Sequence, residues 1–383
     1  MQDVSELRRR YVCPARRVVI KVGTNVLAAP NAPDGGIDDS RIGAIVDQVA
    51  ALVKGGRQAA LVTSGAIACG MAELGLRRRP TTLPGTQAAA SVGQGALMAL
   101  YEKHFRRHGL HAAQILMTHE DFDNRERYLN ASNTIHALFD LPCVPVINEN
   151  DTISTAEIRF GDNDRLAALV THMVRAELLI LLTSVPGLYA EPPRKGSPGR
   201  IVEVVERVGP ELGQVVYDEK TPLGLGGMAS KIEAARIASE AGEAALIADG
   251  RDPLIIQKIM SGEPVGTLFL PAGGKLKSYK RWLRFTSRPQ GAVHVDEGAR
   301  AALVERGRSL LPSGITRVEG EFDRGALVRI KGPDGVEFAR GLSNYSHAEI
   351  ERIKGCQTAR MEKVLGHKHY DEVIHRDNLA LSQ

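Results

Sequence analysis

The sequence predicts an α/β fold, with helices on both faces of a mainly parallel sheet, followed by a small β-rich domain. Short apolar runs alternate with stretches of helical periodicity, which is the pattern of strand–helix–strand units. Each run gives way to small or polar residues, as the carboxyl ends of strands do in doubly wound sheets. The runs lie at residues 18–20, 59–62, 115–117, 144–147 and 178–182.

The size and composition of the chain predict a soluble protein of two or three domains. The chain has 383 residues, and a domain usually has ~100–200. Hydrophobic residues make up 43% and charged residues 25%, as in soluble globular proteins. A net charge of +4 does not by itself imply a nucleic-acid partner. We expect an α/β domain over 1–270, a basic linker over 271–288, a β-rich domain over 289–370 and a tail over 371–383.

Cysteine spacing and hydropathy predict a cytoplasmic protein without a membrane partner. The cysteines lie far apart and form no CxxC pair, which argues against a zinc site or a disulfide framework. This usage fits a reducing cytosol. Arg16, Arg17 and Lys21 interrupt what would be the apolar core of a signal peptide. No apolar run approaches the ~20 residues of a spanning helix.

The first predicted strand, at 18–20, continues into Lys21 and a small-residue turn, Gly23 to Asn25. A lysine in a buried strand is costly unless it meets an anion. The turn that follows is a place where backbone amides can approach a phosphate. A lysine on an edge strand that points to water is the alternative.

The second predicted strand, at 59–62, follows a helix over 42–53 and ends at Thr63, Ser64 and Gly65. The first glycine of a Gly-x-Ser-x-Gly elbow is missing, which argues against a nucleophilic serine. A hydroxyl or amide contact to a substrate is favoured instead. Further helices are predicted over 86–108 and 125–138.

The most informative stretch is 144–166, where a strand at 144–147 runs into the polar cluster 148–151. A second polar cluster, 161–164, leads into a helix over 166–174. Asp and Asn can cap a helix, and the free N–H groups there favour an anion. Two ordinary turns would need far fewer polar residues, so the stretch predicts a binding site. The next strand, 178–182, also ends in hydroxyls, those of Thr183 and Ser184.

A glycine-rich turn, 224–231, precedes a further helix and predicts a phosphate cradle. It is not a P-loop, because Lys231 follows Ser230 rather than preceding it. Its glycine spacing mimics a dinucleotide fingerprint, but no convincing strand precedes it. Lys231 would oppose the helix dipole unless phosphates lay beside it.

Five motifs, taken in order, resemble those of the amino acid kinase family. The family implies a sandwich of helices around a mainly parallel sheet, with ATP and a carboxylate substrate across the strand ends. The closest likeness is to members that convert L-glutamate into L-glutamyl 5-phosphate, the first step of proline biosynthesis. The motifs are 19–24 (VIKVGT), 62–66 (VTSGA), 146–151 (VINEND), 161–164 (GDND) and 226–231 (GGMASK).

The resemblance also implies roles for individual residues. Lys21, Lys231 and Asp164 would be catalytic, with the aspartate holding both lysines. The glutamate-binding residues would be Ser64, Asp151 and Asn163. The ATP contacts would be Lys21, Gly23, Thr183, Ser184, Leu225, Gly226, Gly227, Met228, Ala229, Ser230 and Lys231. Ser184 stands where many relatives carry Asp, and Leu225 where some carry Thr. Both residues are among the implied ATP contacts, so both departures lie on the nucleotide side.

The residue types agree with phosphoryl transfer to a carboxylate. A Glu carboxyl has a pKa of ~4.3, so the acceptor is ionised at neutral pH and needs no general base. The reaction needs positioning and charge compensation, which two lysines and Mg²⁺ would supply. Phosphate oxygens and water can hold most of the Mg²⁺ shell, so we name no protein metal ligand.

The C-terminal part resembles a PUA domain in 295–299 (VDEGA), 310–315 (LLPSGI) and 322–325 (FDRG). Short alternating runs there predict strands. Aromatic residues are sparse, so base stacking on RNA is poorly supported. We expect a structural or regulatory role. The basic stretch 271–290 is either a solvated linker or an anionic contact surface.

Two classes of function therefore stay open: a carboxylate kinase, and an RNA-associated protein that acts through its C-terminal domain. Within the first class, the acceptor could be aspartate or an acylated glutamate instead of glutamate. A homo-oligomer is expected, and the family implies proline as a feedback inhibitor.

Overall fold

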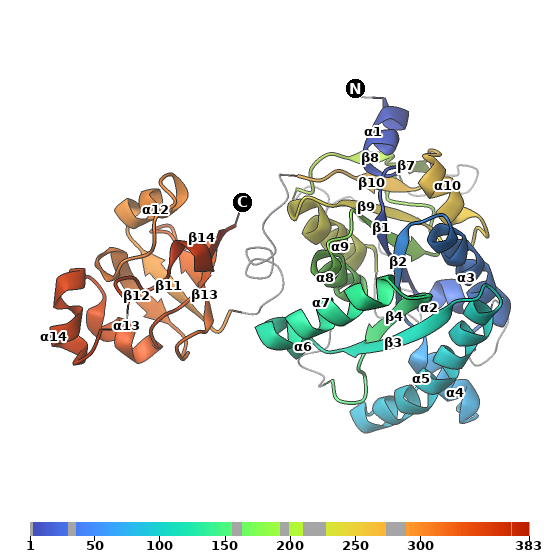
Figure 1. Cartoon of the computed structure of the whole chain (residues 1–383), viewed down its shortest axis with the longest axis horizontal. Coiled ribbons are helices and arrows are strands. Elements are labelled where there is room, and N and C mark those ends of the chain that lie inside the picture. The colour runs from blue at the N-terminus through green and yellow to red at the C-terminus, as the bar shows by residue number, and fades with distance from the viewer. Residues whose placement is uncertain are drawn as a thin grey trace. The chain divides into compact units, whose positions relative to one another are not determined.

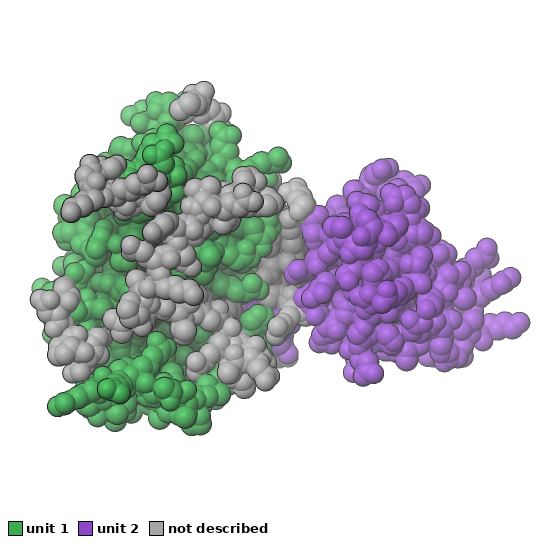
Figure 2. All heavy atoms as spheres, turned by 180° about the vertical axis from the view of Figure 1, so that it is seen from behind, with its two compact units in different colours: residues 1–121, 125–275 green, residues 122–124, 276–383 purple. Residues whose placement is uncertain are grey.

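The computed structural model describes residues 3–29, 36–154, 163–191, 199–209, 227–272, 289–368 and 370–382. The chain forms two compact units, which Figure 2 colours separately. The first comprises residues 1–121 and 125–275, and the second residues 122–124 and 276–383. Among the described residues, no helix has both the length and the apolar character that a membrane span requires.

The first unit is built on a sheet whose described strands follow the order β3-β4-β2-β1-β5-β9-β10-β8. Neighbours from β3 to β9 pair in parallel, and β10 is antiparallel to β9. β1 and β5 lie in the middle of the sheet, as their apolar sequences predict. The strands are β1 Arg17–Val22, β2 Gln58–Thr63, β3 His111–Met117, β4 Cys143–Glu149, β5 Leu178–Thr183, β8 Val204–Val205, β9 Ala244–Asp249 and β10 Thr267–Phe269; β6 Tyr189–Glu191 and β7 Arg200–Ile201 pair separately.

Helices cover both faces of this sheet (Figure 1). One face carries α3, α5 and α10, whose apolar residues join a single core with alternate residues of the central strands. The other face carries α7, α8 and α9, which pack on β4, β1 and β9. The helices are α1 Val4–Tyr11, α2 Thr24–Leu27, α3 Asp39–Lys54, α4 Ala66–Glu73, α5 Leu83–Arg106, α6 His119–Asp123, α7 Arg125–Phe139, α8 Asn163–Val174, α9 Met228–Glu240 and α10 Ile255–Ser261.

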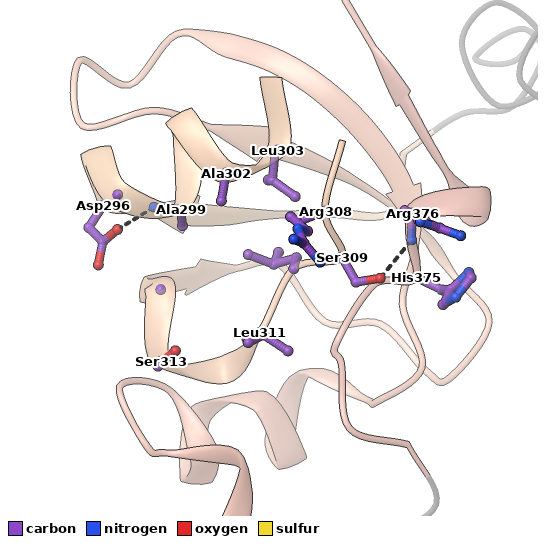
Figure 3. A pocket seen from close by; sticks show the side chains of 13 residues that line it. Asp296, Ala299, Ala302, Leu303, Arg308, Ser309, Leu311, Ser313, His375 and Arg376 are labelled. Atoms are coloured by element: carbon purple, nitrogen blue, oxygen red, sulfur yellow. Dashed lines mark hydrogen bonds between the residues drawn. The ribbon is translucent and has the colours of Figure 1, made fainter. Parts of the chain in front are cut away.

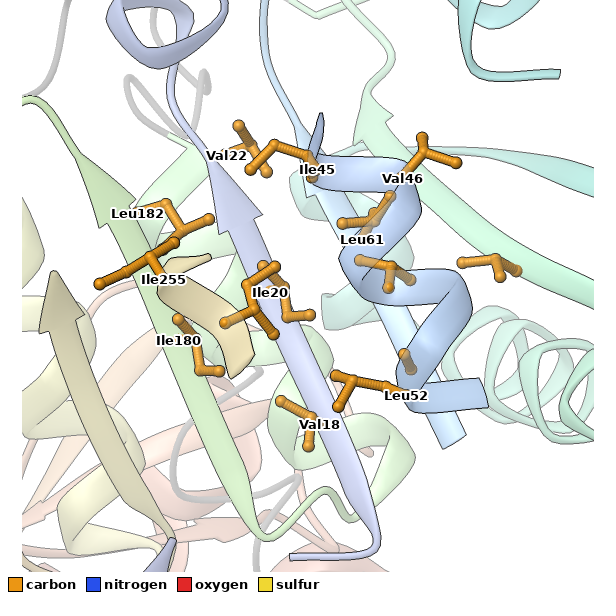
Figure 4. Close-up of a cluster of buried hydrophobic side chains, with 14 of the residues drawn as sticks. Val18, Ile20, Val22, Ile45, Val46, Leu52, Leu61, Ile180, Leu182 and Ile255 are labelled. Atoms are coloured by element: carbon orange, nitrogen blue, oxygen red, sulfur yellow. The ribbon is translucent and has the colours of Figure 1, made fainter. Parts of the chain in front are cut away.

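The pleat of β1 decides which face receives its lysine. Val18, Ile20 and Val22 are fully buried and point toward Ile45 and other residues of α3, as Figure 4 shows. Side chains alternate along a strand, so Lys21 lies on the opposite face, the face of α8.

The predicted α/β sandwich is confirmed, with two differences in its elements. α8 begins at Asn163, so Asn163 and Asp164 form its first turn instead of preceding it. The predictions did not include β9, β10 and β8, which extend the sheet beyond β5.

The first helix ties the beginning of the unit to its end. The Arg8 side chain is fully buried, although arginine is among the least buried residue types. It donates hydrogen bonds to the carbonyl oxygens of Val265 (2.8 Å) and Gly266 (3.0 Å).

The second unit has its own sheet, of order β12-β11-β13-β14-β15, and its own core, as predicted for a β-rich domain. β15 lies within 371–383, the segment predicted as a tail, and pairs with β14. Most of the predicted basic linker, 273–288, lies outside the described residues. The elements are β11 Gly291–Val295, α12 Glu297–Val304, η3 Pro312–Gly314, β12 Ile315–Glu319, β13 Leu327–Lys331, β14 Glu337–Leu342, α13 His347–Ile353, η4 Thr358–Arg360, α14 Met361–Leu365, η5 Arg376–Asn378 and β15 Leu379–Leu381.

Candidate active site

Two lysines from distant parts of the first unit meet at one aspartate. The Nζ atom of Lys21 lies 2.6 Å from Oδ1 of Asp164, and Nζ of Lys231 lies 3.0 Å from Oδ2. The hydroxyl of Ser230 donates to the same Oδ2 over 2.9 Å. The strand β1 and the first turns of α8 and α9 therefore bring the three predicted catalytic residues together.

Burial strengthens the charge–charge interactions within this cluster. The exposed fraction is 0% for Asp164, 3% for Lys21 and 6% for Lys231. Removing a charge from water costs several kcal/mol or more, so buried charges need partners. Within the trio, two ammonium groups face one carboxylate, which leaves a net positive charge. Such a cluster favours an incoming anion, and the low local dielectric strengthens that attraction.

The predicted substrate residues Asn163 and Ser64 are also in contact. Nδ2 of Asn163 donates to Ser64 Oγ (3.0 Å), to the Thr63 carbonyl (2.6 Å) and to Oδ1 of Asn148 (2.9 Å). Gly65 follows Ser64 with a φ of 106°, a left-handed conformation that glycine adopts without strain. The end of β2 and the start of α8 thus hold a hydroxyl and an amide side by side.

The loop after β4 places the third predicted substrate residue. Asp151 is half-buried in the turn that follows the strand. In the same loop, Glu149 accepts a 2.9 Å hydrogen bond from the hydroxyl of Ser154. Gly161 and Asp162, in the fourth motif, lie outside the described residues.

On the predicted nucleotide side, α9 begins at Met228 with Gly227 as its N-cap, and the described chain supplies no side-chain cap for this helix start. Its first N–H groups, at Met228, Ala229 and Ser230, are of the kind that bind phosphate oxygens. The Gly227 carbonyl accepts from Ser230 Oγ (2.8 Å) and Lys231 Nζ (3.4 Å). Leu225 and Gly226 lie outside the described residues.

Two further predicted nucleotide contacts follow central strands. Thr183 and Ser184 are half-buried at the end of β5, next to the strand that carries Lys21. Gly23 lies beside that lysine, because a Cβ added there would be 3.6 Å from Lys21 Nζ.

The sequence predictions did not assign a role to three side chains that support this site. Asn148, at the end of β4, is 2% exposed and donates through Nδ2 to Oε1 of Gln94 over 2.8 Å. Tyr101 shares a 2.8 Å hydrogen bond with the Thr63 hydroxyl, and burial raises the pKa of its phenol. Gln94 and Tyr101 are seven residues apart, so α5 presents both on one face. Only Asn148, inside the polar cluster 148–151, carried a signal in the sequence.

The second unit contains a cavity of about 660 Å³, shown in Figure 3. Apolar side chains of α12, such as Leu303, line it together with Leu311, Arg308 and Arg376.

Two protein families match the sequence. Residues 16–249 match the amino acid kinase family, and residues 291–365 match the PUA domain. Among solved structures, a UMP kinase from Bacillus anthracis covers 68% of this chain and 98% of its own. It has 14% identity to this chain and a TM-score of 0.46.

Curated relatives match nearly the whole length. The glutamate 5-kinase of Geobacter sp. strain M21 is 47% identical over 375 residues, which cover 98% of this chain and 100% of the relative. The glutamate 5-kinase of Thermoanaerobacter sp. strain X514 is 45% identical over 365 residues, covering 95% and 97% of the two chains. By the extent of these matches, the chain belongs to the amino acid kinase family and carries a PUA domain in its C-terminal part.

Proposed function

We propose that the chain transfers the γ-phosphoryl group of ATP to the γ-carboxylate of L-glutamate and forms L-glutamyl 5-phosphate, as in the first step of proline biosynthesis. The match to relatives named glutamate 5-kinase over 95–98% of the chain is the observation that carries this proposal. The buried cluster of Lys21, Asp164 and Lys231 supports it, because it combines a positive charge with protection from water.

The chemistry follows from the charges at this cluster. The acceptor carboxylate is ionised at neutral pH, so its oxygen attacks the γ-phosphorus without a general base. Negative charge spreads over the phosphoryl oxygens in the transition state and is stabilised by fixed positive groups nearby. Lys21 and Lys231 are such groups, and Asp164 holds both before the substrates bind. The bond between the γ-phosphorus and the β–γ bridging oxygen breaks, and its electron pair stays on that oxygen as ADP leaves.

The acid substrate would lie against Ser64, Asp151 and Asn163, at the carboxyl ends of β2 and β4. The nucleotide would extend from the lysines toward Thr183, Ser184 and the start of α9. Gly23 beside Lys21 and Gly227 at the N-cap of α9 carry no side chain, so phosphates would approach the backbone closely there. A Mg²⁺ ion bound to the nucleotide would compensate phosphate charge, held largely by phosphate oxygens and water.

The test is a substrate screen with ATP and Mg²⁺ in the presence of hydroxylamine, which converts an acyl phosphate into a hydroxamate. We expect ADP release and hydroxamate with L-glutamate, and at least tenfold less with L-aspartate or N-acetyl-L-glutamate. A preference for either of those acids would overturn the choice of acceptor, and ADP release without hydroxamate would overturn the reaction type.

The same preparation tests the remaining parts of the proposal. Light scattering measures whether the chain forms the homo-oligomer expected of it. ADP release with and without added proline measures feedback inhibition. Cell fractionation shows whether the protein is cytoplasmic.

A further inference from the structure

Three amide side chains form a chain of hydrogen bonds behind the predicted glutamate site. Gln94 of α5 accepts from Nδ2 of Asn148, and Oδ1 of Asn148 accepts from Nδ2 of Asn163. Asn163 in turn donates to the hydroxyl of Ser64. We call Gln94, Asn148 and Asn163 the amide relay.

Backbone groups fix the direction of the amide relay. The Glu149 N–H can only donate, and it donates to Oδ1 of Asn148 over 2.9 Å. The Thr63 carbonyl can only accept, and it accepts from Nδ2 of Asn163. Nδ2 of Asn148 must therefore face Gln94, and the atom of Gln94 that receives it must be the oxygen.

The last donor of the amide relay has no acceptor within the described parts of the chain. Nε2 of Gln94 is buried and forms no hydrogen bond with any described residue. Buried polar groups are almost always paired, because a buried donor without a partner destabilises the fold. Among the described residues, the Gln94 side chain forms a hydrogen bond through its oxygen alone, and that oxygen contacts the predicted substrate site through Asn148.

We propose that Gln94 is a positioning residue for the acid substrate, an inference that rests on the proposed function. Its oxygen holds the Asn148 amide in the orientation that presents Oδ1 to Asn163. A reversed Asn148 would set its NH₂ group against that of Asn163 and turn the latter away from Ser64. Gln94 thus acts through Asn148 and sets the affinity for glutamate, not for ATP.

The first experiment measures steady-state kinetics of Gln94→Met, which keeps the side-chain length and removes the acceptor. We expect the KM for glutamate to rise about tenfold, the equivalent of one well-formed hydrogen bond, with the KM for ATP within about twofold of wild type. Gln48→Met is the matched control. Gln48 is also a helical glutamine whose side-chain oxygen is used as an acceptor, and it accepts from the Ile256 N–H at the start of α10. We expect that control to lower stability without changing either KM.

The second experiment is a double-mutant cycle, which a purely structural role would not satisfy. Asn148→Ala alone should raise the KM for glutamate, and adding Gln94→Met should change it by less than about twofold further. Gln94→Leu removes the same acceptor with a different side-chain shape and should raise the KM for glutamate in the same way. The unfolding temperature of each variant shows whether it folds.

Each outcome has a distinct meaning. An unchanged glutamate KM in Gln94→Met, or fully additive effects in the cycle, would overturn the positioning role alone. A wild-type chain that does not phosphorylate glutamate would overturn the proposed function, and this inference with it.

Discussion

At the scale of single residues, the site depends on two positive charges that one carboxylate holds in place. Lys21 and Lys231 come from opposite ends of the first unit's sequence, yet both Nζ atoms lie within 3.0 Å of Asp164. Each lysine is buried, so neither charge is screened by water as a surface lysine would be.

Lys21→Met and Lys231→Met should each lower kcat by about 10²–10³-fold, because each removes one fixed charge that stabilises the transition state. The measurement is ADP release with glutamate at saturating ATP. Lys103→Met is the control, since Lys103 forms an exposed ion pair with Asp39. Turnover within threefold of wild type in either buried-lysine variant would contradict the proposed role.

The sequence predicted much of the site at this scale, because most of its residues stand in polar clusters after apolar runs. Gln94 could not be predicted, since a single glutamine in an Ala- and Gly-rich helix forms no pattern. Its importance appears only when α5 packs beside the end of β4. Leu225 and Gly226 remain predictions, because they lie outside the described residues.

At the scale of elements, α4 and α5 approach each other so closely that their backbones are in contact at two glycines. A Cβ added at Gly70 would lie 1.7 Å from the Ala89 carbonyl oxygen, and one at Gly93 would lie 1.8 Å from that of Ala66. The contact keeps α5 in place, and α5 carries Gln94 and Tyr101 toward the site.

Gly70→Ala should therefore destabilise the first unit by at least about 3 kcal/mol, because the clash is with backbone and cannot be relieved by a rotamer change. Gly95→Ala is the control on the same pair of helices, since its Cβ would meet no described atom within 4 Å. That variant should gain about 0.5–1 kcal/mol from helix propensity. Urea unfolding measures both; equal stabilities for the two variants would refute the packing argument.

A capping box at α13 gives a prediction for pH. Hydrogen bonds from Arg324 and then from Ser346 hold the pKa of Glu349 at about 2, below its ordinary value of 4.5. Because the folded-state pKa is depressed, the stabilisation is complete above pH 4.5 and is lost as the pH falls toward 2.

Hydrogen exchange of the α13 amides measures this contribution. Glu349→Gln should speed exchange at pH 7, and the difference from wild type should narrow as the pH is lowered below 4.5. Glu297→Gln, in the first turn of α12, is the control and should leave α13 unchanged. A difference that stays constant down to pH 3 would argue against the carboxylate as its source.

Strands with a long apolar run could be predicted from the sequence, and alanine-rich or short strands could not. β1, β4 and β5 are continuous apolar runs, as expected for strands buried on both faces. Half of the residues of β9 are alanine, which gives weak strand propensity, and β12 and β15 have five and three residues. Their pairing depends on neighbours far away in the sequence, which local patterns do not contain.

At the scale of the whole molecule, the two units have separate cores and separate sheets. All described residues of the proposed active site belong to the first unit. We therefore propose residues 1–270 as an independent catalytic domain, with a C-terminal domain that begins at 289 and extends past the predicted boundary at 370 to include β15.

A chain that ends at residue 272 tests this division, and it keeps the hydrogen bond from the Ala272 N–H to the Ser239 carbonyl. We expect it to fold cooperatively and to keep kcat within about tenfold of the full chain, since each unit buries its own apolar surface. Loss of folding in this shortened chain would show that the catalytic unit needs the C-terminal unit.

The position of Arg8 has a consequence for how the protein is made. Among the described residues, its guanidinium group donates to the carbonyls of Val265 and Gly266, and β1 in the middle of the sheet pairs with β5, which begins at Leu178. A ribosome thus releases the first helix and the central strand long before their partners exist. We expect the nascent chain to stay open along one edge of β1 until β5 has been made, near the middle of synthesis, and helper proteins that shield apolar segments to bind it during that interval.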